Sequence, residues 1–219
     1  MERPFTDRHE AGRLLAQQLS PYASRRDVVV LALPRGGVPV AFEVAAALGA
    51  PLDVLPVCKL GTPWHAELAM GALSSNGAQF VDEALVREAG VSAAQLQSAL
   101  ATARIELGRR EARYRGERPP VAVAGRVALV IDDGMATGAS LQAAARALAT
   151  LGPARIVAAV PVAPALARNR LGNAVDELVS VLAPQHFYSV GQFYLDFDQV
   201  GDDTVRELLD EAARGPDLS

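Results

Sequence analysis

The chain has 219 residues, of which 50% are hydrophobic and 21% charged, and its net charge is −4. Such a composition is typical of a globular protein with a substantial core, and the small negative charge predicts no general attraction to nucleic acid or acidic membranes. The one cysteine, Cys58, excludes an internal disulfide framework. Residues 1–10 are polar, and the chain has no apolar run of ~20 residues. These two features predict a cytoplasmic protein without a membrane partner.

Short apolar runs of strand length alternate with amphipathic segments of helix length along the chain. Asp7 and Glu10 resemble a capping box at the start of the first helix. In chain order, the pattern predicts a helix from residue 7 to about 19, a strand at 27–33, a helix at 38–48, a strand at 52–58, a loop with a short hairpin at 59–81, a helix at 92–114, a strand at 126–131, a helix at 140–151, a strand at 155–162, a short helix after Pro164, and a strand at 177–183.

This alternation favours the α/β class, with an open, mainly parallel β-sheet flanked by helices in a Rossmann-like arrangement. Such sheets bind ligands in the crevice at the carboxyl ends of their strands. Unusual residues follow two of the predicted strands, those at 27–33 and 126–131. We therefore expect these two strands to be neighbours.

The first strand end is the sequence LPRGG, residues 33–37. Two consecutive glycines let the backbone approach a ligand closely, and Arg35 offers a planar set of donors suited to phosphate oxygens. A helix that starts here points its free amides at the same place. Taken alone, the pentad is a weak signal, because a tight strand-to-helix turn that carries a surface arginine explains most such pentads.

The second strand end, VALVIDDGMATGAS at 127–140, is more specific. Asp132 and Asp133 can accept hydrogen bonds from paired sugar hydroxyls or hold a divalent cation. The small residues after them leave backbone amides exposed for an anion, with Thr137 and Ser140 as added donors. The alternative, an acidic turn before an ordinary helix cap, requires neither a second aspartate nor the run of small residues.

The segment 104–118 contains six arginines and three glutamates. Interspersed charges of both signs are typical of a solvated helix face. The alternative is an arginine-rich surface that binds RNA or DNA in a regulatory protein. The overall acidity of the chain counts against this alternative.

These motifs together resemble those of the type I phosphoribosyltransferases. The family's central motif is a run of apolar residues, two acidic residues and a small-residue phosphate loop, and VALVIDDGMATGAS matches it throughout. LPRGG and Lys59 resemble the family's pyrophosphate loop and a basic residue that leads into its flexible loop. FYSVGQFYLDF, at 187–197, resembles the hood of the hypoxanthine-type enzymes with one extra residue.

The resemblance implies a role for each matching position. Asp132 and Asp133 would hold the ribose hydroxyls of phosphoribosyl pyrophosphate (PRPP), and Phe187 or Tyr188 would stack on an acceptor base. Asp196 would help to bind Mg²⁺, the implied cofactor, partly through the ligand and water. The 5′-phosphate would be bound by Gly134, Met135, Ala136, Thr137, Gly138, Ala139 and Ser140, and the pyrophosphate by Pro34, Arg35, Gly36, Gly37 and Lys59.

The chain departs from the family pattern in two places. The 6-oxopurine enzymes have an aspartate in the phosphate loop where this chain has Ala136, so their base-handling step does not transfer. AELAMG, at 66–71, loosely resembles the adenine-type flexible loop, which makes Glu67 a candidate proton carrier or an ordinary surface glutamate. The extra hood residue leaves the acceptor open.

The expected organisation is a single phosphoribosyltransferase-like domain over 1–219. Its core would be about 25–182, with a flexible loop and hairpin at about 59–82, a helical insertion at about 92–115, and a hood at about 183–198 plus terminal helices. Within it, 61–77 is the candidate lid. The implied activity transfers phosphoribose from PRPP to a nitrogen acceptor such as a nucleobase, in a homodimer. Alternatives are a PRPP-sensing regulator, and a ribose-phosphate hydrolase or phosphorylase.

Overall fold

A five-stranded parallel sheet forms the centre of the molecule. The computed structural model describes residues 4–65 and 69–214. The strand order is β2-β1-β6-β7-β8, with β1 (Val28–Ala32), β2 (Leu52–Val54), β6 (Val127–Ile131), β7 (Arg155–Val162) and β8 (Glu177–Leu182). Every residue of β1 and β6 is buried, as expected when both faces of a parallel sheet are covered. The predicted α/β class is confirmed.

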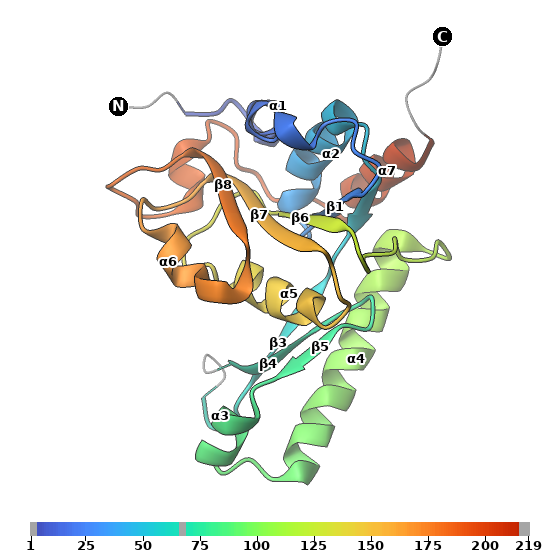
Figure 1. Cartoon of the computed structure of the whole chain (residues 1–219), viewed down its shortest axis with the longest axis vertical. Coiled ribbons are helices and arrows are strands. Elements are labelled where there is room, and N and C mark those ends of the chain that lie inside the picture. Colours follow the sequence, from blue (N-terminus) through green and yellow to red (C-terminus); the bar gives the residue numbers. More distant parts are fainter. Residues whose placement is uncertain (1–3, 66–68, 215–219) are drawn as a thin grey trace.

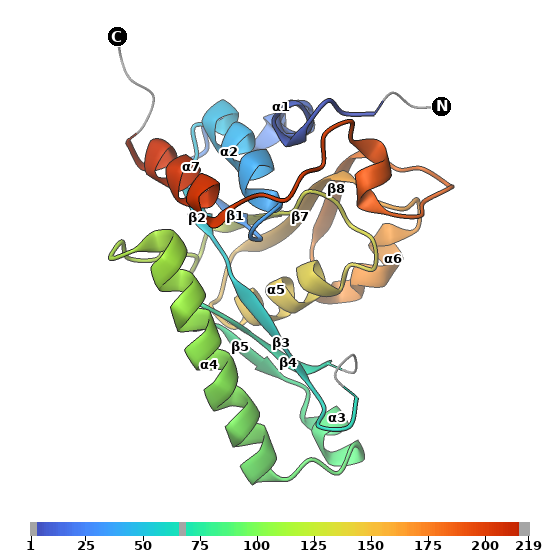
Figure 2. The ribbon, with the colours of Figure 1, turned by 180° about the vertical axis from the view of Figure 1, so that it is seen from behind.

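Helices cover the two faces of this sheet (Figures 1 and 2). One face carries α1 (Arg8–Gln18), α2 (Gly37–Leu48) and α7 (Asp202–Arg214), and the other carries α5 (Ala139–Ala149) and α6 (Ala167–Leu171). Successive strand residues alternate between the two cores, since Val28 and Val30 pack on the first face while Val29 and Leu31 pack on the second. Over the described residues, no helix combines the length and apolar character needed to span a membrane.

A smaller antiparallel sheet projects from this core together with the long helix α4 (Figure 2). Its apolar faces pack on α4 at one side, through Leu60 and Met70, and on α5 at the other, through Ala72. The elements of this part are β3 (Val57–Gly61), β4 (Ala69–Ser74), β5 (Gln79–Val81), α3 (Glu83–Glu88) and α4 (Ala93–Arg115). Short 3₁₀ turns elsewhere are η1 (Ser20–Tyr22), η2 (Gly172–Ala174) and η3 (Val190–Phe193).

One local prediction is wrong. The single strand expected at 52–58 is divided at Pro56, which has no amide to donate to a ladder. Leu55 still donates its amide to Ala32 of the large sheet, whereas Val57 pairs with Ser74 of the small one. The candidate lid at 61–77 contains β4, which pairs with β3 and β5 as the hairpin expected in this region, and its movement as a lid stays a prediction.

A buried ion pair fastens α4 to the large sheet. Arg115 is only 4% exposed, and its Nε and Nη2 donate to the two carboxylate oxygens of Asp53 on β2, both at 3.0 Å. The same carboxylate accepts the amides of Val54 and Val121, and Arg115 also pairs with Glu111. This arginine, predicted to lie on a solvated helix face, is instead a structural anchor.

Removing one partner of this pair should therefore destabilise the protein strongly. Asp53→Asn removes the buried carboxylate that accepts Arg115 and leaves only the more exposed Glu111 as its counter-ion, and we expect the free energy of unfolding in urea to fall by about 3 kcal/mol, the lower end for a broken buried pair. The exposed Arg25–Asp27 pair provides the control, because Asp27→Asn should leave the free energy of unfolding nearly unchanged. Equal losses in the two variants would contradict the anchoring role.

Candidate active site

The two motifs predicted to be neighbours lie side by side at the carboxyl edge of the sheet. Strands β1 and β6 are adjacent and parallel, with Ala32 opposite Ile131. The amide of Leu33 donates to the carbonyl of Ile131 at 2.8 Å, which continues this pairing beyond the strand. The turn at 33–37 therefore directly faces the acidic residues at 132–133.

The glycines of the first turn make this close approach feasible. A Cβ atom on Gly36 would lie 2.0 Å from Oδ2 of Asp133, and one on Gly37 would lie 2.7 Å from the carbonyl oxygen of Ile131. Larger residues at either position would push the turn away from the acidic pair. The peptide bond between Pro34 and Arg35 in this turn is cis.

The adjacent carboxylates of Asp132 and Asp133 are partly buried at this edge. The Asp133 amide donates to Oδ1 of Asp132 at 2.9 Å. Burial, followed by repulsion from Asp133, raises the pKa of Asp132 well above its usual range. Burial also raises the pKa of Asp133, although Arg8 opposes this shift. Two such carboxylates offer several acceptor positions to sugar hydroxyls or a cation.

Arg8, at the start of α1, is a site residue that sequence reasoning missed. Its Nε and Nη2 each lie 2.9 Å from Oδ2 of Asp133, and its side chain is only 10% exposed. Nη1 donates to the carbonyl of Asp198, and the guanidinium lies 4.0 Å from the ring centroid of Phe197. No local pattern could reveal this contact, because 125 positions separate Arg8 from Asp133.

The hood segment is joined to the N-terminal segment. Phe5 donates its amide to Phe193 and accepts that of Leu195, so that residue 5 pairs with the hood like a short strand. Tyr194 donates its hydroxyl to the Asp133 carbonyl at 2.6 Å. Burial raises the pKa of this tyrosine, so it remains a neutral donor. The N-terminal segment and the hood thus support the acidic pair together.

The small-residue loop from 134 to 140, predicted to bind the 5′-phosphate and called the phosphate loop below, leads into α5. The Met135 amide donates to the Val162 carbonyl and its side chain is buried, so this amide is not a free donor for a phosphate. Ala136, Thr137 and Ser140 are exposed. Gly138 has a φ of 81°, a conformation that favours glycine, and the first turn of α5 follows with amides that have no intrahelical acceptor.

Basic side chains approach this loop from other elements. Arg170 of α6 donates to the Ala136 carbonyl. Lys59 of β3 is exposed and lines a pocket of about 350 Å³ together with Thr137, Ala139 and Arg146. The structure therefore places the predicted Lys59 beside the phosphate loop. Glu67, the candidate proton carrier, lies outside the described residues.

The predicted hood residues differ in their surroundings. Phe187 packs on Phe193, with ring centroids 5.4 Å apart, whereas Tyr188 is 89% exposed and available for stacking. Asp196 is exposed, and its Oδ1 accepts the amide of Asp198. The backbone amide of Asp196 donates to the Thr6 carbonyl, which keeps this residue within the strap formed by the hood and the N-terminal segment.

A metal site made by protein ligands alone is absent from the described part of the chain, which has no suitable group of three or more His, Cys, Asp or Glu residues. Mg²⁺ is commonly held by one or two carboxylates together with substrate phosphates. The acidic pair beside an anion-binding loop fits that mode. Asp132 and Asp133 are thus the residues that would share such an ion with a phosphorylated ligand.

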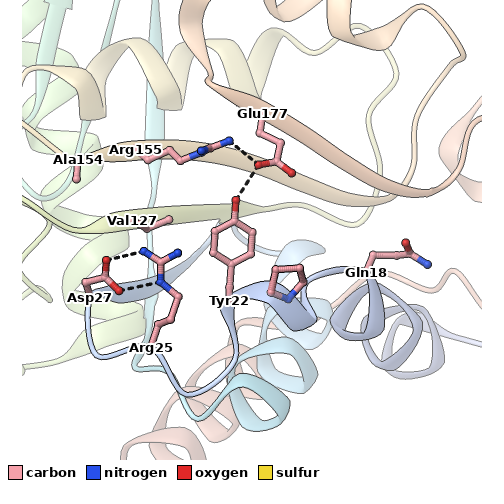
Figure 3. Close-up of a pocket in the computed structure, with 9 residues that line it drawn as sticks. Gln18, Tyr22, Arg25, Asp27, Val127, Ala154, Arg155 and Glu177 are labelled. Carbon is pink, nitrogen blue, oxygen red and sulfur yellow. Dashed lines mark hydrogen bonds and ion pairs between the residues drawn. The ribbon is translucent and has the colours of Figure 1, made fainter.

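The pocket in Figure 3 lies at the opposite end of the sheet. It is lined by the amino ends of β6, β7 and β8 and encloses about 430 Å³. Its charges are satisfied internally, since Arg25 pairs with Asp27 while Arg155 and the Tyr22 hydroxyl both bond Glu177. Ligands of parallel α/β sheets bind at the carboxyl ends, so we do not assign this pocket to the active site.

Fold and site together define an α/β domain with an acidic pair and a small-residue loop at the carboxyl edge of its sheet. The model of the phosphoribosyl transferase domain family matches residues 6–198, and the chain belongs to this family. This agrees with the family resemblance of the central motif.

Known proteins similar to the chain support the same assignment. A protein of Mycobacterium tuberculosis (strain ATCC 25618 / H37Rv), named "Putative phosphoribosyl transferase Rv0571c", is 45% identical over 210 residues, which is 96% of this chain and 47% of that protein. The chain thus spans about half the length of the curated relatives it matches.

Two solved structures are similar to the chain. TT1426 from Thermus thermophilus is 43% identical, with a TM-score of 0.86 over 96% of this chain and 99% of that one. AQ2163 from Aquifex aeolicus, at 10% identity and a TM-score of 0.50, covers 84% of this chain and 78% of that one and shares the fold alone.

The raised pKa of Asp132 predicts that Asp132→Asn increases stability at neutral pH. Because the folded-state pKa lies above the unfolded value, the protonated form favours folding, and this contribution is lost as the pH rises through the folded pKa. The neutral amide does not incur this loss. Urea unfolding at several pH values should give the variant a higher free energy of unfolding than the wild type at pH 7. This difference should become smaller toward pH ~4, near the unfolded pKa of aspartate. A wild-type protein that is more stable at pH 7 would contradict the assignment.

Arg8→Ala should raise the pKa of Asp133 further, because the cation that favours its ionised form is lost. A ¹³C NMR titration of the aspartate carboxyl groups measures this directly. Arg13→Ala, on the same helix but paired with Glu43, is the matched control. An unchanged Asp133 titration in Arg8→Ala would show that the ion pair does not set the charge of the site.

Proposed function

We propose that the protein transfers the 5-phosphoribosyl group of PRPP to a nitrogen acceptor and releases pyrophosphate. The observation that carries this proposal is the juxtaposition of the acidic pair, the phosphate loop and the LPRGG turn at one sheet edge. Asp132 and Asp133 accept the ribose hydroxyls, and the loop from Ala136 to Ser140 binds the 5′-phosphate. This arrangement leaves the anomeric carbon facing the first turn.

The chemistry requires mainly electrostatic stabilisation. The bond between the anomeric carbon and pyrophosphate breaks, the sugar gains oxocarbenium character, and negative charge builds up on the leaving group. The amide of Gly36 and the side chains of Arg35 and Lys59 stabilise this charge, whereas the Gly37 amide already donates to the Leu33 carbonyl. Mg²⁺, when bound with PRPP, supplies further neutralisation of the pyrophosphate oxygens. Glu67 is a candidate carrier for the proton that the acceptor loses.

The proposed acceptor is a nucleobase. Tyr188 supports this choice because it is an exposed aromatic residue on the hood, where it can stack on a planar ring. Phe187 contributes by packing on Phe193 within the hood. Asp196, which is exposed, is proposed to help bind Mg²⁺, partly through the ligand and water. Homodimer assembly is proposed from the family resemblance.

The test is calorimetric titration with PRPP in the presence and absence of Mg²⁺. We expect Mg²⁺-dependent binding that Asp132→Asn weakens at least tenfold, because the neutral amide is a weaker acceptor for the ribose hydroxyls and a weaker ligand for the cation. Urea unfolding of the same variant at pH 7 is the control, because a folded variant shows that a loss of binding does not come from unfolding. Unchanged PRPP affinity in this variant would refute the assignment of the acidic pair.

Turnover then distinguishes the transferase from its alternatives. Incubation with PRPP and Mg²⁺ should release pyrophosphate quickly only when a nucleobase is added. Fast release without an acceptor would identify a hydrolase instead. Tight PRPP binding with no turnover across a panel of nucleobases would favour a sensor.

A further inference from the structure

A stripe of charged residues on α4 faces the LPRGG turn. Glu106, Arg109, Arg110, Arg113 and Tyr114 follow one another at helical spacing, which places them on one side of the helix. Together with Pro34, Arg35 and Asp202, the first residue of α7, they line a pocket of about 340 Å³. We call this the arginine pocket. It contains residues of three elements that are far apart in the sequence.

The arginine pocket has more cationic groups than anionic ones. Arg109 and Arg110 both donate to Glu106, while Arg113 pairs with Asp202 and Arg35 lies 3.8 Å from the same carboxylate. Four guanidinium groups thus share two carboxylates in the described part of the chain. Each guanidinium has five N–H donors, more than these partners can use. The remaining donors are available to a ligand.

Neighbouring arginines of the same segment behave differently. Arg115 is buried on Asp53, Arg118 donates to the Leu209 carbonyl, and Arg104 donates to the side chain of Gln79. The arginines of the expected solvated helix face therefore fall into two groups: some bond to other elements, and the others line the arginine pocket. Only the pocket arginines converge on one recess.

We propose that the arginine pocket binds a small phosphate-bearing anion of the pyrophosphate class, at a site separate from the acidic pair and the phosphate loop. Planar guanidinium groups bind phosphate oxygens in pairs, and an anion with several phosphate oxygens can engage donors of Arg109, Arg110 and Arg113 at once. The anion would replace Glu106 and Asp202 as their partner. This site goes beyond the proposed transferase activity.

Arg35 connects this site with the turn proposed to hold pyrophosphate. It lines the arginine pocket, yet its backbone belongs to the turn that faces Asp133. An anion in the pocket draws the Arg35 side chain away from Asp202 and fixes its position. Occupancy of the two sites is therefore coupled, and by linkage each ligand changes the affinity of the other by the same factor.

A small anion fits this pocket better than a nucleic acid. Nucleic acid needs an extended basic surface for its phosphate backbone, and the chain as a whole has a net charge of −4. The recess is also formed between elements and is not a continuous basic surface.

The experiment is calorimetric titration of the full chain with inorganic pyrophosphate, compared between wild type, Arg109→Ala/Arg110→Ala and Arg104→Ala. If both sites take pyrophosphate, the wild type and Arg104→Ala should bind two per chain and the double variant one. If the proposed PRPP transfer is wrong and the LPRGG turn binds no pyrophosphate, the wild type should bind one pyrophosphate per chain and the double variant none. This result would still support the arginine pocket as an anion site. Equal stoichiometry in wild type and double variant refutes it.

Two further measurements keep the outcome interpretable. Arg110→Gln, which retains hydrogen-bonding capacity but no charge, should weaken pocket binding at least threefold, with thermal unfolding confirming that each variant is folded. A short single-stranded RNA serves as the competing ligand. RNA that binds more tightly than pyrophosphate, and is lost in the double variant, would overturn the small-anion proposal.

Discussion

The structure around the active site depends on holding two adjacent carboxylates in a partly buried position. Asp132 and Asp133 repel each other and lose hydration at the end of β6, so an isolated pair would be protonated or displaced. Arg8 counters this at Asp133, and Tyr194 fixes the backbone between the pair and the phosphate loop. The N-terminal helix and the hood are therefore electrostatic components of the site and not merely its cover.

This constraint also predicts that binding and stability conflict at Asp132. Under the proposed function, a charge that is costly in the free protein would become useful when sugar hydroxyls or a cation share it. Functional sites commonly retain such unfavourable groups at the expense of stability. The close contact of Gly36 with Asp133 is related, because the turn must come near enough to place its amides and the carboxylates around one ligand.

The α4 extension links the site to the rest of the molecule. It is anchored by Arg115 on Asp53, supports the small sheet that carries Lys59, and brings its arginine stripe to the LPRGG turn. The position of Lys59 therefore depends on this helix, and Arg35 shares a pocket with it. Through Arg35, anion binding in the proposed arginine pocket would be coupled to ligand binding at the LPRGG turn.

Several features followed from sequence alone because their causes are local. Apolar runs predicted the parallel strands, and the two motifs at strand ends predicted that β1 and β6 are neighbours, because ligand-binding residues of such sheets meet at the carboxyl edge. The family resemblance agreed with the family match. Contacts between distant positions were decided only by the tertiary structure. They are Arg8 with Asp133, Arg115 with Asp53, and Arg35 beside the α4 stripe. Side-chain periodicity predicts which face of a helix or strand is buried, but it does not identify the residues that pack against this face. Which charged residues form ion pairs depends on how the folded chain brings distant positions together.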